Sequence, residues 1–94
     1  MQRVLIVGAG QGGSALLETL LKTNMIQIIA IADLDLEAPG MVEAKKNGID
    51  TTTDWKEYIK DDIDIIIETT GSSVVLKELI EKKPEHAVIV PSSM

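Results

Sequence analysis

The chain has no cysteine and no phenylalanine, and it has one tryptophan, one tyrosine and one histidine among 94 residues. The lack of cysteine excludes disulfides, thiolate chemistry and cysteine-ligated metals. Basic residues are outnumbered by acidic ones, 9 to 15, and the net charge of -6 argues against direct nucleic-acid binding and against charge-driven membrane binding. No apolar run is long enough for a membrane span, and no signal peptide is recognisable, so a cytoplasmic setting is expected.

What the chain does have is aliphatic residues: hydrophobic side chains make up 45% of it. A core of Val, Ile, Leu, Ala and Met suits a parallel sheet, because strands buried on both faces are rich in Val and Ile. The length predicts one domain, residues 1–94, and a domain this small is marginally stable alone. We expect a homodimer for this reason, and also because nothing is predicted to cover the edge of the fifth strand.

Apolar runs and helical periodicity alternate along the chain. Strands are predicted over residues 3–8, 25–32, 49–52, 63–69 and 87–90. Helices are predicted over residues 12–22 and 39–47, as a short helix over residues 54–59, and as a helix that contains residues 74–80. Pro39 fits the first turn of the second helix, whereas Gly40 weakens that prediction. The alternation predicts an α/β fold, a Rossmann-like doubly wound parallel sheet of order 3-2-1-4-5 with helices on both faces.

The stretch VLIVGAGQGG, residues 4–13, joins the first strand to the first helix and contains the pattern G-x-G-x-x-G. In that pattern Gly8 allows a tight turn out of the strand. Gly10 lets a pyrophosphate approach the backbone, and Gly13 lets the helix pack closely against the strand. A strand before the motif and a helix after it favour a dinucleotide site over a glycine-rich turn without a ligand.

The residues between these glycines complete the predicted cradle. The helix start presents unpaired N–H groups and the positive end of its dipole to phosphate. Since the backbone makes these contacts, an acidic chain can still bind a dinucleotide. The amides of Ala9, Gln11 and Gly12 are expected to line the cradle.

Asp33 lies 20 residues after Gly13, at the end of the second predicted strand. A carboxylate there accepts hydrogen bonds from the adenosine ribose and repels a 2′-phosphate. Residues 34–38 contain no Arg or Lys, so NAD(H) is favoured over NADP(H). Leu34 is expected to line the same site. Asp35 is a rival for the role of Asp33, and a solvated strand-end charge is the alternative reading of either.

A polar segment ends the fourth predicted strand, where the switch point of the 3-2-1-4-5 order lies and where ligands bind. Thr69, Thr70, Gly71 and Ser72 are therefore predicted to contact the cofactor. Glu68 is a charge late in a buried strand, and both a functional and a structural role are open for it.

Catalytic residues are not evident. His86 lies in a charged turn before the last strand and has no partner spaced for acid–base work. One histidine without cysteine does not make a metal site. Trp55 and Tyr58 are interpreted as packing residues of the short helix. Asp54 and Glu57 resemble a capping box at its start.

The glycine loop, the segment ADLDLEAPG at residues 32–40 and the stretch DIDIIIETTGSSVVLKELIEKKP resemble the N-terminal domain of dihydrodipicolinate reductase and Gfo/Idh/MocA-type oxidoreductases. The chain is most similar to the stand-alone version at the N-terminus of bacterial sensor kinases and sigma-54-type regulators, in which the APG segment is typical. The resemblance implies NAD binding by Gly8, Gly10, Gly13 and Asp33. It also implies an output domain (kinase, ATPase or DNA-binding) after residue 94.

Three functions are compatible with these patterns. The favoured one is an NAD(H)-binding module that senses cofactor or redox state for a larger bacterial signalling protein or transcriptional regulator. The second is the cofactor half of an NAD-dependent oxidoreductase. The third is an interaction domain that has kept the fold without the ligand, because a fold alone does not fix a function.

Overall fold

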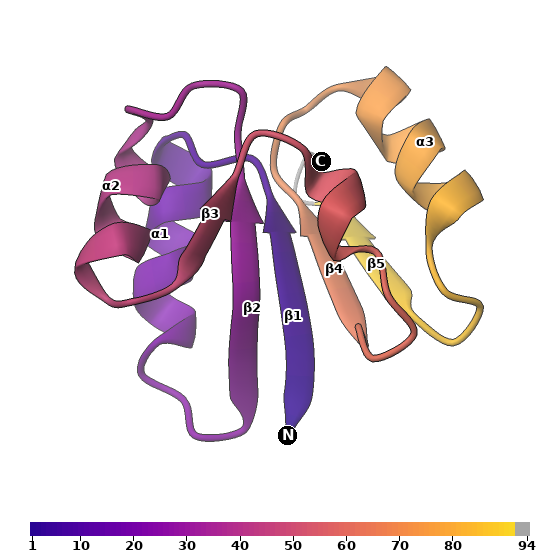
Figure 1. Ribbon diagram of the computed structural model, residues 1–94, viewed down its shortest axis with the longest axis horizontal. Coiled ribbons are helices and arrows are strands. Elements are labelled where there is room, and N and C mark those ends of the chain that lie inside the picture. Colours follow the sequence, from indigo (N-terminus) through magenta and orange to yellow (C-terminus); the bar gives the residue numbers. More distant parts are fainter. Residues whose placement is uncertain (92–94) are drawn as a thin grey trace.

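The computed structural model describes residues 1–91 and shows one parallel sheet of five strands in the order β3-β2-β1-β4-β5 (Figure 1). The strands are β1 (Gln2–Val7), β2 (Ile26–Ala32), β3 (Asp50–Thr52), β4 (Ile65–Glu68) and β5 (Val88–Pro91). The helices are α1 (Gln11–Leu20), α2 (Pro39–Lys46), the 3-10 helix η1 (Trp55–Tyr58) and α3 (Ser73–Lys82). The predicted α/β class, strand order and Rossmann-like architecture are confirmed.

The central strand β1 pairs in parallel with β2 on one side and with β4 on the other. Its residues 4–7 are buried, because helices cover both faces of the sheet. A run of four apolar residues without polar alternation is what such a strand requires. The glycine loop leaves the sheet at the carboxyl end of β1, between the carboxyl ends of β2 and β4.

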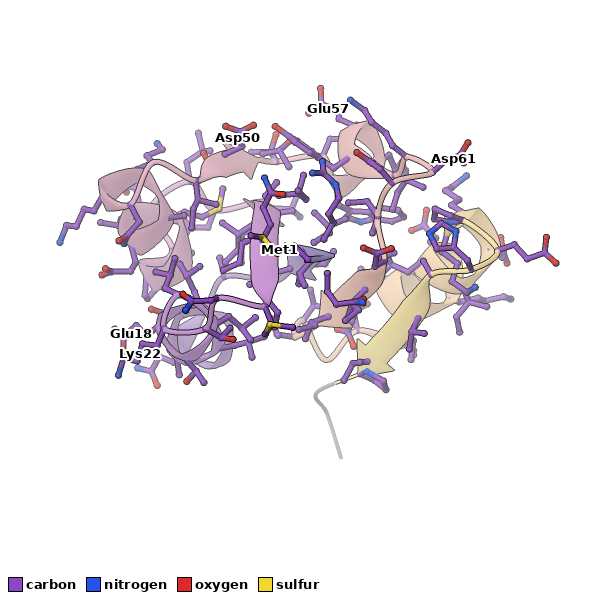
Figure 2. The ribbon with its side chains drawn as sticks, turned by 90° about the horizontal axis from the view of Figure 1, so that it is seen from below. Met1, Glu18, Lys22, Asp50, Glu57 and Asp61 are labelled. Atoms are coloured by element: carbon purple, nitrogen blue, oxygen red, sulfur yellow. The ribbon has the colours of Figure 1, made fainter. Side chains whose placement is uncertain are left out.

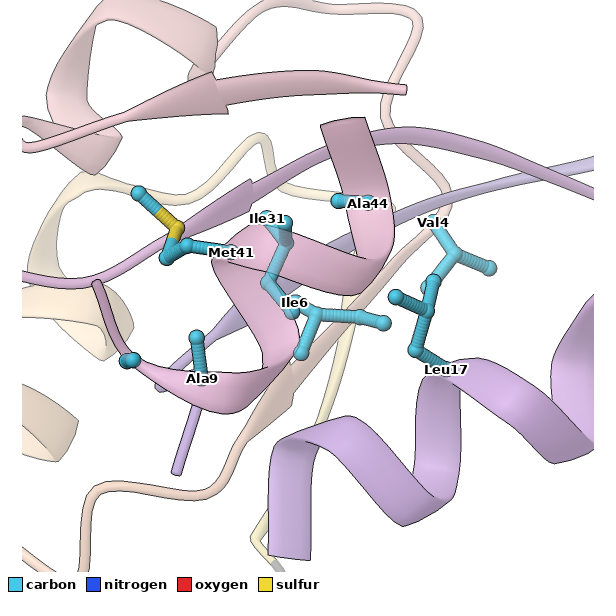
Figure 3. Packing of buried hydrophobic residues seen from close by; sticks show 8 residues of the cluster. Val4, Ile6, Ala9, Leu17, Ile31, Met41 and Ala44 are labelled. Atoms are coloured by element: carbon cyan, nitrogen blue, oxygen red, sulfur yellow. The ribbon is translucent and has the colours of Figure 1, made fainter. Parts of the chain in front are cut away.

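Side chains alternate across the sheet and form two cores. On one face, Leu17 of α1 and Met41 and Ala44 of α2 pack on residues of β1 and β2, as Figure 3 shows for Val4, Ile6 and Ile31. The opposite face is covered by η1 and α3. There the core members are Leu5, Val7, Ala30, Ile63, Ile66 and Leu79, with Trp55 and Val75 packed against them.

The view along the strands separates these layers. In Figure 2, Met1 lies at the near end of the sheet, with α1 and α2 on one side and α3 on the other. Exposed charged side chains project outward from the surface, among them Glu18 on α1 and Lys22 in the turn that follows it. Across residues 1–91, none of the helices has the length and apolar character that a membrane crossing needs.

Two local predictions are corrected. The third helix is only one turn of 3-10 helix, and its start is not a capping box. Asp54 does cap it, with its side chain accepting from the Lys56 N–H, but Glu57 does not reach back to the Asp54 N–H. The Glu57 carboxylate accepts instead from the Thr52 hydroxyl at 2.7 Å, because the end of β3 brings that hydroxyl close.

Candidate functional site

The glycine loop makes a turn that only glycine fits at its first position. Gly8 has a φ of +110°, and a Cβ there would collide with the Thr69 hydroxyl. The Gly8 N–H donates to the Ala32 carbonyl at 2.7 Å, and the Thr69 hydroxyl donates to the Gly8 carbonyl at 2.9 Å. The turn therefore ties the ends of β1, β2 and β4 together.

The other glycines of the motif divide into packed and open positions. A Cβ on Gly13 would collide with the Gly8 carbonyl oxygen, so the start of α1 rests directly on the turn. At Gly10 and Gly12 a Cβ would meet no atom within 4 Å. Gly10 is the N-cap of α1, and no side chain caps this end of the helix. The backbone of Gly10 is thus free for close approach from outside.

Ala9 is held on both sides by segments distant in sequence. Its N–H donates to Asp33 Oδ2 at 2.8 Å, and its carbonyl accepts from the Gly40 N–H at 2.7 Å. A Cβ on Gly40 would come within 2.9 Å of that same carbonyl oxygen. Gly40 is therefore required for close contact between α2 and the loop, and it does not merely weaken a helix.

A cleft of about 650 Å³ opens above the loop, at the carboxyl ends of the strands. We call it the glycine-loop cleft. Gly8 and Gly10 form its base. Its sides are the β2 wall (Asp33 and Leu34), the η1 wall (residues 53–56) and the β4 wall (Thr69, Thr70, Ser72 and Val75).

The β2 wall places one of the two rival carboxylates at the cleft. Asp33 lines it, with Oδ2 on the Ala9 N–H and Oδ1 on the Asp35 N–H at 2.8 Å. Asp35 is exposed, and its carboxylate accepts from the Glu37 N–H outside the cleft lining. Leu34 also lines the cleft and is 89% exposed.

The β4 wall is organised by a buried carboxylate. Glu68 is only 1% exposed, and its Oε2 accepts from the Thr70 hydroxyl and, at 2.8 Å, from the Gly71 N–H. Gly71 has a φ of +73°, and Ser72 caps α3 by accepting from the Val75 N–H. Glu68 thus has a structural role in shaping this loop.

The η1 wall was missed from the sequence. Trp55 packs in the second core and also lines the cleft. Lys56 lines it too, with its Nζ 5.7 Å from the Trp55 ring centroid and 3.6 Å from Glu78 Oε2 on α3. A usable signal existed: residues 53–56 follow β3 directly, and the carboxyl ends of parallel strands meet at one edge.

Several predicted residues lie near the cleft without lining it. Ala9 is fully buried, and its N–H is taken by Asp33. Gln11, Gly12 and Gly13 form the first turn of α1 beside Gly10, and Gly71 lies between two lining residues.

Other titratable groups lie at the opposite end of the sheet. His86 precedes β5, and its Nε2 is 3.7 Å from Asp64 Oδ1 at the amino end of β4. Arg3 forms an ion pair with Asp62 at 2.8 Å in the same region. Within residues 1–91, no three His, Cys, Asp or Glu side chains gather closely enough to hold a metal ion.

Two comparisons with known proteins were made. No model of a known protein family matches the chain, and a search of curated proteins also finds no match.

Proposed function

We propose that the chain is an NAD(H)-binding regulatory module of a larger bacterial signalling protein or transcriptional regulator that works in the cytoplasm. The observation that carries the proposal is a single cleft that contains both an open Gly10 backbone and the Asp33 carboxylate. It lies at the switch point of the sheet, where doubly wound folds bind ligands.

Each part of a dinucleotide has a matching group. A pyrophosphate over Gly10 meets the uncapped start of α1, whose N–H groups and dipole favour anions. Each oxygen of Asp33 accepts one backbone N–H and retains a lone pair, so the carboxylate can also accept ribose hydroxyls. Ribose binding would therefore leave the Asp33–Ala9 contact in place.

The Asp33 carboxylate also supports a preference for NAD(H) over NADP(H), because it repels a 2′-phosphate. Residues 34–38 contain no Arg or Lys that could bind a 2′-phosphate. The cleft nevertheless contains one cation from another segment, Lys56. Asp33→Ala should weaken NADH and narrow its advantage over NADPH. Lys56→Gln should leave that ratio unchanged, since Glu78 and the Trp55 ring already engage the Lys56 ammonium group. Calorimetric titration of both cofactors measures the ratio.

A regulatory role is supported by the segment at residues 32–40, which resembles the stand-alone domains of sensor kinases and sigma-54-type regulators. In this structure the segment contacts the glycine loop through the Gly40 N–H, which donates to the Ala9 carbonyl. The alternative, the cofactor half of an oxidoreductase, would use the same cleft. The sequence that follows residue 94 in a longer protein separates the two: a kinase, ATPase or DNA-binding segment supports the regulator, and a catalytic domain supports the enzyme.

The test of cofactor binding is an isothermal titration of the chain with NADH. Wild type should bind, and Gly10→Val should abolish binding, because the valine side chain fills the space that the pyrophosphate needs. Ala15→Val places the same side chain at an exposed position of α1 outside the cleft lining, and it should bind as wild type does. Wild-type protein that fails to bind millimolar NADH contradicts the proposal.

We further propose that the module is a homodimer that pairs through β5. Val88 and Val90 on this edge strand are 57% and 44% exposed. An unpaired edge with apolar side chains is a surface on which a second strand can add. Sedimentation should show a dimer for wild type and a monomer for Val88→Lys/Val90→Lys, and a monomeric wild type at high concentration contradicts dimerisation.

A further inference from the structure

The glycine-loop cleft draws its walls unequally from the two halves of the sheet. A doubly wound dinucleotide fold combines two mononucleotide-binding halves. The half built from β1, β2 and β3 contributes the base, the β2 wall and the η1 wall. The other half contributes only the β4 wall, and none of the described residues of β5 lines the cleft.

The β4 wall also has few free side-chain hydrogen-bond donors. The Thr69 hydroxyl donates to the Gly8 carbonyl, and the Thr70 hydroxyl donates to Glu68. Thr70 also accepts from the Ser72 N–H, and Ser72 accepts from the Val75 N–H. A nicotinamide carboxamide has both an acceptor oxygen and a donor NH₂ group, so it needs partners of both kinds. The Thr69 and Thr70 hydroxyl donors are already used within the protein, and the Ser72 hydroxyl is the side-chain donor that this wall has left.

The opposite side of the cleft offers what an adenosine needs. Leu34 and Trp55 present apolar surface at the β2 and η1 walls, and Asp33 lies beside Leu34. Leu34 is 89% exposed, so covering it with a planar base removes apolar area from water without rearranging the core. Burial of a base, acceptance of ribose hydroxyls and pyrophosphate binding at Gly10 all fall on this side.

We infer that the glycine-loop cleft, with walls from β1, β2, η1 and β4 and none from β5, recognises the adenosine diphosphate group and does not distinguish oxidised from reduced nicotinamide. The inference rests on the proposed function and narrows it. The module would report the combined pool of NAD⁺ and NADH and not their ratio.

The test compares ligands that share or lack the adenosine diphosphate group. Dissociation constants for ADP-ribose, NAD⁺ and NADH are measured by calorimetry, with nicotinamide mononucleotide as the ligand that lacks adenosine. ADP-ribose and NADH carry the same formal charge, so their comparison isolates the nicotinamide. We expect the three adenosine ligands to agree within about threefold, a difference below 1 kcal/mol. Nicotinamide mononucleotide should not bind.

A matched pair of variants locates the adenosine. Leu34→Ser and Leu36→Ser both change an exposed leucine after β2, but only Leu34 lines the cleft. Leu34→Ser should weaken all three adenosine ligands alike, by roughly tenfold if its side chain is covered on binding. Leu36→Ser should leave them unchanged. Fluorescence of Trp55, the chain's one tryptophan, should change when ADP-ribose binds to either variant.

Each outcome has a distinct meaning. If NADH or NAD⁺ binds more than about threefold tighter than ADP-ribose, the cleft reads the nicotinamide and the inference is overturned, while the proposed function survives. Equal losses in Leu34→Ser and Leu36→Ser would also overturn it. If none of the adenosine ligands binds, the proposed function fails and the inference fails with it.

Discussion

The loop after β1 and the loop after β4 both shape the cleft, but they are held in different ways. Ala9 in the first loop is held by Asp33, which follows β2, and by Gly40 in the first turn of α2, both far away in sequence. The loop after β4 contacts the first loop through Thr69, whose hydroxyl donates to the Gly8 carbonyl, but its remaining contacts are internal, since Glu68 bonds to Thr70 and Gly71. Damage to the first loop should therefore spread through the fold, and damage to the second should stay more local.

The largest effect is expected where backbone meets backbone. Gly13→Ala adds a Cβ that collides with the Gly8 carbonyl, and neither group is a flexible side chain. We expect a loss of about 3 kcal/mol in the free energy of unfolding, typical of overpacking. Gly12→Ala is the matched control, because its Cβ meets open space, and it should be neutral or stabilising by up to about 1 kcal/mol. Urea denaturation measures both, and equal losses would contradict the division into packed and open glycines.

Glu68 should produce the next largest effect. Glu68→Ala removes a fully buried side chain together with the acceptor of the Thr70 hydroxyl and the Gly71 N–H, at a cost of about 2 kcal/mol. Glu68→Gln keeps one oxygen in place of Oε2 and should cost less. Hydrogen exchange should show the Gly71 and Ser72 amides losing protection while the Ala9 amide keeps it. Loss of protection at Ala9 as well would mean that the two loops are coupled.

Asp33 tests the long-range clamp. Asp33→Ala removes the acceptor for the Ala9 and Asp35 N–H groups, but the site is partly exposed, so water replaces part of what is lost. The expected cost is about 1 kcal/mol, with faster exchange at Ala9. Asp35→Ala removes a single bond, to Glu37, and should cost less and leave the exchange at Ala9 unchanged. An unchanged exchange rate of the Ala9 amide in Asp33→Ala would contradict the role of Asp33 in holding the first loop.

The smallest effect is expected at Tyr58, which lies outside both loops. Burial raises the pKa of Tyr58 above its ordinary value of 10.0, with smaller contributions from the charge of Asp50, which accepts its hydrogen bond, and from Glu57. A raised folded-state pKa gives stability that is present below the unfolded pKa and is lost as pH rises through the folded pKa. Between neutral and strongly alkaline pH, the melting temperature should therefore fall more in wild type than in Tyr58→Phe. If the melting temperatures of the two proteins fall in parallel with pH, the raised pKa of Tyr58 is contradicted.

The sheet order could be predicted because the evidence for it is local: five apolar runs, helical spacing between them and right-handed crossovers. The roles of Gly8 and Gly13 followed from the same pattern. The role of Gly40 did not, because its reason is a contact with Ala9 across the fold. The cleft role of Trp55 was missed since a residue that packs in a core can also line a cleft. Such double roles depend on tertiary placement.

The most direct test of the central claim, that the glycine-loop cleft is a dinucleotide site, is an NMR titration of ¹⁵N-labelled chain with NADH. Amide shifts should concentrate at five residues that line the cleft, Gly8, Gly10, Asp33, Leu34 and Trp55, while Val88 and Ile89 of β5 stay unchanged. The absence of shifts at millimolar NADH, or shifts centred on β5 and sparing Gly10 and Asp33, would contradict it.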